Sequence, residues 1–133
     1  MELLIVISII AILSVALVFI LNPAETLKKS RDAQRIADLN TLKTAMGLYL
    51  TSTSTANLNQ AGSGVCTATR SSTSTAIVLV DGTGWLNANL TTLTGGSPIS
   101  NLPLDPTNSG IYGYRYRCST DGSKFEISTA LES

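Results

Sequence analysis

The sequence predicts an α+β protein in which one long N-terminal helix precedes a small antiparallel β-sheet. Three observations support this prediction: an uncharged apolar run, an amphipathic helical pattern after it, and short alternating segments near the end. We expect an apolar half-helix over residues 1–23, an amphipathic half-helix over 24–51 and a β-sheet head domain over 52–133. The apolar half is expected to project, and the amphipathic half to pack on the sheet.

The apolar run extends from Leu3 to Leu21, contains no charge, glycine or proline, and carries only two hydroxyls, those of Ser8 and Ser14. As a helix it would be roughly 28 Å long, about the thickness of the hydrocarbon core of a bilayer. Each hydroxyl can bond to a carbonyl one turn earlier, so neither interrupts the helix. A helix exposed to water has a polar stripe, and this one has none. The run must therefore be surrounded by lipid or by protein on every side.

Two simpler explanations of the run are a cleaved signal peptide and a single-pass membrane anchor. A signal peptide needs a basic segment before the run, but only Met1 and the acidic Glu2 stand there. For an anchor, the four basic residues within 28–35 favour a cytoplasmic location for the polar part. The two cysteines favour the opposite side of the membrane, and a basic leader that is removed after insertion would reconcile these signals.

Glu2 places a carboxylate at the edge of the apolar run. A charge in this position is costly and usually has a partner. Glu2 either lies at the membrane–water interface or pairs with a positive group, such as the amino terminus of a neighbouring copy when the apolar helices bundle.

Asn22 and Pro23 interrupt the helical pattern. Proline lacks an N–H and pushes the residue before it out of the helical region, so we expect a kink or a short unwound stretch near residues 19–23. Beyond it, an apolar stripe predicts an amphipathic helix over 27–50 that covers the sheet. The residues of this stripe are Ile36, Leu39, Leu42, Met46, Tyr49 and Leu50.

The charges of the amphipathic half are expected on its solvated face. Glu25 and Lys29 are four residues apart, and Asp32 and Arg35 are three apart, so each pair can form a weak ion pair along the helix.

Three later segments have the pattern of strands. The apolar segment 77–80 ends at the turn signal Asp81-Gly82. Residues 111–118 alternate, with three tyrosines on one face, and residues 125–129 alternate after the turn signal Asp121-Gly122. The tyrosine face is expected to pack on the helix rather than to form a binding or stacking surface.

Cys66 and Cys118 are the only cysteines, and the chain has no histidine with which they could form a zinc site. We expect a structural disulfide, which in the chain-entropy model would stabilise the fold by about 4 kcal/mol. A disulfide implies an oxidising compartment outside the cytoplasm.

The composition favours a structural role over catalysis. Without histidine, a glycine-rich phosphate loop or a paired-carboxylate motif, no enzyme and no cofactor are expected. Nine Lys and Arg balance nine Asp and Glu, so no overall positive charge indicates binding to nucleic acid. In the proline-rich loop 95–110, Asp105 and Asn108 offer oxygen ligands for calcium, although Asp-Pro is also a common turn element.

The first 21 residues, MELLIVISIIAILSVALVFIL, resemble the start of a mature type IV pilin or type II secretion pseudopilin. In that family a leader peptidase cleaves after a glycine and exposes Phe-Thr-Leu, then Ile or Met, then Glu. Glu2 aligns with this glutamate and Met1 with the residue before it, so the family's first three residues would precede Met1. The loop 101–106 with its tyrosine-rich strand is similar to a loop and sheet of the family, and the cysteine pair is similar to a disulfide in its head domain.

Two features depart from the family's pattern. The glycine that is common in the middle of the apolar segment is absent, with Ala11 in its neighbourhood, and Pro23 lies about one turn later than the usual proline.

The resemblance implies a subunit that waits in the cytoplasmic membrane and is then extracted into a helical filament of identical copies. The filament would be an extracellular pilus for adhesion, motility or DNA uptake. The implied partners are further copies of the chain, the membrane before assembly, the pilus assembly machinery and the leader peptidase, and the terminal amine would be methylated. Nucleic-acid binding stays open. The residues expected to carry assembly are Glu2, Leu3, Leu4, Ile5, Ile9, Leu13, Leu17 and Pro23.

Two alternatives remain at this point. A pseudopilin would form a short periplasmic piston for secretion, and a monomeric surface protein would use the apolar run only as a membrane anchor.

Overall fold

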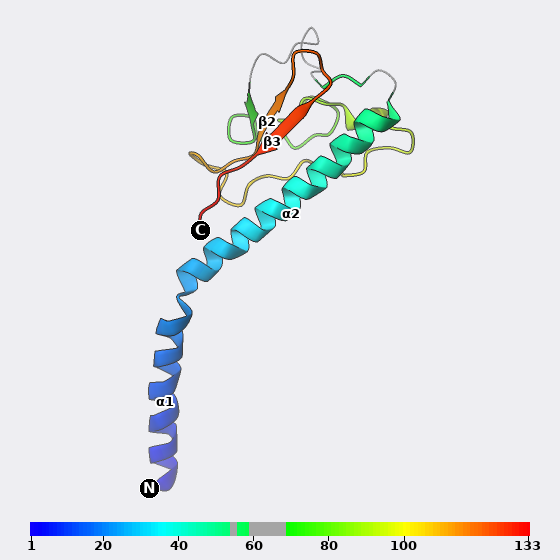
Figure 1. Cartoon of the computed structure of the whole chain (residues 1–133). Coiled ribbons are helices and arrows are strands. Elements are labelled where there is room, and N and C mark those ends of the chain that lie inside the picture. The colour runs from blue at the N-terminus through cyan, green and yellow to red at the C-terminus, as the bar shows by residue number, and fades with distance from the viewer. Residues whose placement is uncertain (54–55, 59–68) are drawn as a thin grey trace. The chain divides into compact units, whose positions relative to one another are not determined.

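The computed structural model of the chain describes residues 1–53, 56–58 and 69–133, and it is α+β, as the sequence predicts (Figure 1). Two compact units are present, residues 1–33 with 132–133 and residues 34–131. The elements in chain order are α1 (Glu2–Leu21), α2 (Pro23–Ser52), β1 (Arg70–Ser71), the 3-10 helix η1 (Leu90–Thr92), β2 (Arg115–Cys118) and β3 (Phe125–Ser128).

The helical segment is interrupted at Asn22, which lies between α1 and α2. Asn22 adopts the left-handed conformation with φ 38°, which asparagine tolerates better than most residues do. Pro23 then begins α2, where its missing N–H removes no helical hydrogen bond. The carbonyl of Asn22 instead accepts hydrogen bonds from two backbone N–H groups in the first turn of α2, at 3.1 and 3.2 Å. The interruption predicted near residues 19–23 is therefore confirmed.

The sheet is antiparallel, with β2 between β1 and β3 (Figure 1). Arg115 lies opposite Ser128, Tyr116 lies opposite Ile127, and Arg117 lies opposite Glu126. Side chains alternate between the two faces of a strand. One face therefore carries Tyr116, which is buried, and the other carries both arginines, which are exposed.

Two expectations about strands are wrong. Segment 77–80 is irregular, because its carbonyls accept hydrogen bonds from Trp85, Leu90 and Leu102 rather than from one partner strand. The strand expected over 111–118 is limited to β2, since Tyr112 folds back to bond with Ser109 before the strand begins. β1 is a two-residue strand that the sequence pattern does not predict, whereas β3 lies where residues 125–129 predict it.

The core of the head lies on the inner side of α2. Leu42, Met46 and Tyr49 of the predicted stripe are buried, as is Ala45, and two more of its members, Leu39 and Leu50, are partly buried against the core. Ile36 does not follow it, because its side chain is 52% exposed. The other buried apolar residues of the core are Leu58, Trp85, Leu86, Ala88, Leu90, Leu93, Leu102, Tyr114 and Tyr116.

Trp85 and two tyrosines show how the core satisfies its polar groups. Trp85 is fully buried, and its indole Nε1 donates to the carbonyl of Pro103 at 3.1 Å. Tyr114 donates to a carboxylate oxygen of Asp38 on α2 at 2.6 Å, and Tyr116 donates to the carbonyl of Leu58 at 2.8 Å. The expectation that the tyrosine face packs on the helix is confirmed for Tyr114, and Tyr116 is buried in the same core.

We predict that Leu42→Ala lowers the free energy of unfolding by about 2–5 kcal/mol, because it opens a cavity in the core. Leu48→Ala is the matched control on the same helix, since Leu48 is 46% exposed whereas Leu42 is fully buried. The control is expected to cost less than about 1 kcal/mol. Urea unfolding of the full chain in detergent micelles, followed by the fluorescence of Trp85, measures both. Equal losses in the two variants would contradict the inward orientation of Leu42.

Candidate functional site

The surface of α1 is the candidate functional site. Over residues 3–20, its large apolar side chains range from 52% exposed at Ile7 to 82% exposed at Phe19. The segment Glu2–Ile20 is long and apolar enough to cross a membrane, and none of it is buried inside the chain. Apolar side chains therefore surround α1 on all sides, as its sequence predicts.

The two hydroxyls of α1 do not give it a polar side. Ser8 donates to the carbonyl of Leu4 at 2.7 Å, and Ser14 donates to the carbonyl of Ile10 at 2.8 Å. Both hydrogen bonds lie one turn back along the helix, as predicted. The only ionisable side chain on α1 is that of Glu2, in the first turn, where a negative charge interacts favourably with the helix dipole.

The residues predicted to carry assembly lie on this exposed surface. Ile5, Ile9, Leu13 and Leu17 are four residues apart and follow one face of the helix. Leu3 and Leu4 lie in the first turn and are likewise exposed. Pro23 is exposed at the start of α2. The structure thus groups seven of the eight predicted residues, Glu2 included, on one apolar helix.

A buried ion pair joins α2 to the proline-rich loop of the head. Arg35 donates to both carboxylate oxygens of Asp105, from Nε at 2.7 Å and from Nη2 at 2.9 Å. Both side chains are fully buried. Arg35 also donates to the hydroxyl of Thr107 at 3.2 Å and lies 5.2 Å from the ring centre of Tyr112. This two-pronged geometry fixes the orientation of the loop against the helix.

The oxygens of Asp105 and Asn108 are already used within the protein. Burial alone would raise the pKa of Asp105, but hydrogen bonds from Arg35 and from the backbone N–H groups of Thr107 and Asn108 outweigh burial, so the pKa is lowered. The side-chain oxygen of Asn108 accepts from the hydroxyl of Ser72 at 2.7 Å. A guanidinium in contact with the carboxylate opposes a second cation, so this geometry does not favour calcium at the pair.

A second acidic residue of α2 binds the C-terminal segment. Asp32 accepts the backbone N–H groups of Glu132 and Ser133, both at 2.9 Å, and also the hydroxyl of Ser133 at 2.7 Å. Next to it, Arg31 pairs with the carboxylate of Glu132.

The sequence predicts that the charged side chains of α2 lie on a solvated face, and the structure places some of them elsewhere. Asp32 and Arg35 do not lie on an exposed face: both are buried, and Asp32 accepts from Glu132 while Arg35 donates to Asp105. Glu25 lies 3.7 Å from Lys28, one residue earlier along the helix than the predicted partner, Lys29.

A pattern in the sequence points to Arg35. It lies seven residues before Leu42, and therefore on the same face of the helix as the buried apolar stripe. Sequence reasoning missed its role because arginine is rarely buried without a partner, and the partner, Asp105, lies 70 positions away.

Cys66, one of the two residues of the predicted disulfide, lies outside the described residues. Cys118 is half-buried at the end of β2, with its Sγ 3.5 Å from the carbonyl oxygen of Leu58. The pairing of Cys66 with Cys118 stays a prediction.

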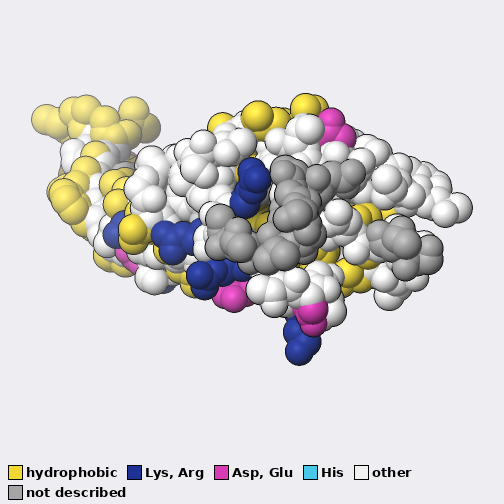
Figure 2. Space-filling view, turned by 90° about the horizontal axis from the view of Figure 1, so that it is seen from above, with side chains coloured by type: hydrophobic (Ala, Val, Ile, Leu, Met, Phe, Trp, Pro, Cys, Tyr) yellow, Lys and Arg dark blue, Asp and Glu magenta, His cyan; other side chains and the backbone are white. Residues whose placement is uncertain are grey.

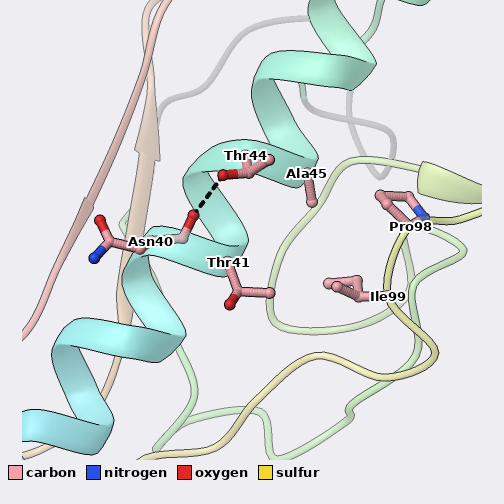
Figure 3. Close-up of a pocket in the computed structure, with 6 residues that line it drawn as sticks. All are labelled: Asn40, Thr41, Thr44, Ala45, Pro98 and Ile99. Carbon is pink, nitrogen blue, oxygen red and sulfur yellow. Dashed lines mark hydrogen bonds between the residues drawn. The ribbon is translucent and has the colours of Figure 1, made fainter.

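An open groove lies between α2 and the loop that carries Pro98 and Ile99 (Figure 3). It has a volume of about 330 Å³, and its other lining residues are Asn40, Thr41, Thr44 and Ala45. The hydroxyl of Thr44 is turned to the carbonyl of Asn40, to which it donates at 2.9 Å. The side-chain amide of Asn40 points away from Pro98 and Ile99, so the groove presents mainly apolar groups.

Comparisons of the chain with protein-family models, with curated proteins and with solved structures found no match. Its long apolar N-terminal helix, second helix and small antiparallel sheet are compatible with a pilin-like fold.

We predict that Arg35→Met lowers the free energy of unfolding by about 3–5 kcal/mol, because it leaves the carboxylate of Asp105 buried without its counter-charge. The double variant Arg35→Met/Asp105→Leu should regain most of this loss, since it removes both charges. Arg31→Met is the control, because the Arg31–Glu132 pair is partly exposed, and it should cost about 1 kcal/mol or less. Urea unfolding in micelles measures all three, and a double variant no better than Arg35→Met would be evidence against the ion pair as the cause.

We also predict a loss of stability in acid that depends on Asp105. Its pKa is lower in the folded protein than the value of about 3.9 in an unfolded chain. The ionised carboxylate therefore stabilises the fold above pH about 4, and this contribution disappears as the pH falls through the folded pKa. Urea midpoints at neutral and acidic pH should show a smaller acid-dependent loss in Asp105→Asn than in the native chain. Glu25→Gln, at an exposed position of α2, is the control and should keep the native pH dependence.

Proposed function

We propose that this protein is the major structural subunit of a pilus-like filament of the type IV class, which assembles by packing α1 from many identical copies. The observation that supports this proposal is the apolar surface of α1, which no other part of the described chain covers. Full burial of a Leu, Ile or Val side chain is worth about 1.5–3 kcal/mol. Bundling of copies would therefore provide a large driving force for assembly.

The same helix suits a membrane pool before assembly. α1 has 20 residues and so rises roughly 30 Å, which matches the hydrocarbon core of a bilayer. In lipid its backbone hydrogen bonds are satisfied within the helix, and its two hydroxyls bond to carbonyls of the same helix. A subunit can therefore exchange lipid for neighbouring copies without exposing polar backbone to an apolar medium.

The polar part of the chain suits the water-facing surface of such a filament. Figure 2 shows uncharged polar side chains and backbone over much of the face in view, together with several Lys and Arg groups left of its centre. Apart from Glu2, the charged residues begin at Glu25, just after the break at Asn22, so the apolar and polar parts are separated along the chain. An extracellular location on the cell surface follows from the proposal.

Glu2 is proposed to align each incoming subunit. Its carboxylate is the only charged side chain of α1, and a charge surrounded by apolar helices needs an opposite charge. The amino terminus of a neighbouring copy can supply this charge when the helices pack side by side.

A single-pass anchor on a monomeric surface protein is the second candidate. The length and composition of Glu2–Ile20 fit an anchor as well as a filament core. A pseudopilin that forms a short periplasmic assembly is a variant of the first candidate, and the length of the filaments distinguishes it.

We predict that Glu2→Ala abolishes or strongly reduces filament yield while the chain stays in the membrane fraction, because removing a charge favours insertion in lipid. Glu25→Ala is the matched control, since it removes a carboxylate beyond the break. Electron microscopy of shed surface material and membrane fractionation of the same cells measure the two properties.

Long filaments of this one chain in the native cells, lost in Glu2→Ala and kept in Glu25→Ala, would support the proposal. Finding only detergent-soluble monomers of the native chain would favour the anchor. Filaments of unchanged yield and helical order in Glu2→Ala would refute the role of Glu2.

A further inference from the structure

The outer face of the β-sheet carries a group of charged and hydroxyl side chains. Arg115 and Arg117 on β2 lie two residues apart and therefore point to the same side. Ser128 and Glu126 on β3 lie directly opposite them. Thr69, just before β1, completes the group. The buried Tyr116 lies between the two arginines and points to the other face, so the core fixes the orientation of the pair.

These five residues line an open pocket of about 370 Å³. Pockets for small ligands begin at about this size. Residues directly opposite each other in an antiparallel pair have their Cβ atoms about 5 Å apart, so the side chains of this group can reach one ligand together.

The charges of the pocket are not balanced. Two guanidinium groups face one carboxylate, and both arginines are exposed. Within the described part of the chain, neither guanidinium is held in an ion pair. Each has five N–H donors in a planar arrangement, which suits a two-pronged contact with a carboxylate or phosphate. An anion would supply the missing negative charge.

We propose that this pocket binds an acidic sugar, meaning a saccharide unit that carries a carboxylate. Arg115 and Arg117 would bind the carboxylate of the ligand. When ionised, the carboxylate of Glu126 accepts hydrogen bonds and donates none. It therefore needs donors, which sugar hydroxyls provide. Ser128 and Thr69 can donate to or accept from further hydroxyls. A plain anion would use the arginines but give the carboxylate of Glu126 no hydrogen-bond donor.

The proposal is independent of filament assembly, because all five residues belong to the unit of residues 34–131 and none belongs to α1. It adds a ligand site on the head, and it holds whether the protein is a filament subunit or an anchored monomer.

The test uses the full chain in micelles of an uncharged polyoxyethylene detergent, titrated at constant ionic strength and followed by nuclear magnetic resonance of backbone and arginine N–H groups. The probes are glucuronate, glucose, acetate and inorganic phosphate. We expect saturating shifts at Arg115 and Arg117 with glucuronate, no shifts with glucose, and weaker binding of acetate.

Three variants distinguish the site from general charge effects. Arg115→Gln and Arg117→Gln should each weaken glucuronate binding by at least about fivefold. Arg70→Gln is the matched control, because Arg70 lies opposite Tyr116 and so belongs to the other face of the sheet, and it should leave binding unchanged. Glu126→Gln should strengthen acetate and phosphate binding and remove the preference for glucuronate.

Several results would overturn the proposal. Equal binding of acetate and glucuronate would show an anion site without sugar recognition, and equal weakening by Arg70→Gln would show a general charge effect. Tighter binding of a single-stranded oligonucleotide than of polygalacturonate, at equal charge concentration, would assign the face to nucleic acid instead. Backbone spectra of each variant that match the native spectra outside the pocket confirm that the fold is kept.

Discussion

The requirement that apolar surface be kept from water determines how this protein can exist. α1 has apolar side chains on all sides, and its two hydroxyls are bonded to its own carbonyls. No change of side-chain rotamer can give such a helix a polar face, so its cover must come from lipid or from other chains. The proposed membrane pool and the proposed filament are two ways to meet this one requirement. When a subunit passes from one to the other, neighbouring copies replace lipid around α1, and the helix is not exposed to water.

The second helix meets a different requirement, because its buried face includes charges. Burying Arg35 and Asp105 has a large desolvation cost, which their two short hydrogen bonds offset only in one geometry. The pair therefore acts more on the specificity of loop placement than on net stability. Asp32 provides a similar constraint for the C-terminal segment by accepting two backbone N–H groups and a hydroxyl. The strands are short and much of the chain beyond α2 is irregular, so helices and strands fix the position of few segments. Polar contacts of this kind fix the positions of the proline-rich loop and of the C-terminal segment.

Successive side chains of a strand point to opposite faces of the sheet, so one face can pack in the core while the other is free to bind a ligand. Tyr116 packs inward, while its neighbours Arg115 and Arg117 point outward and are exposed. Burial raises the pKa of Tyr116, so its hydroxyl stays protonated and donates to the carbonyl of Leu58. The arginines remain available because the core needs only every second residue of the strand. The proposed pocket for an acidic sugar thus lies on the outer face of the sheet, while the inner face packs in the core.

The sequence alone determined the apolar helix, the interruption before Pro23, the helical stripe from Leu42 to Tyr49 and the position of β3, because each depends on interactions between near neighbours. Only the tertiary structure decided that segment 77–80 is irregular, since its carbonyls are taken by three distant N–H groups. Only the tertiary structure brought Asp105 to Arg35, which turned a predicted surface charge into a buried one. Ile36, expected in the buried stripe, is exposed. Pairing across long stretches of chain has no periodic signal, because the partners meet only after the loops between them have folded.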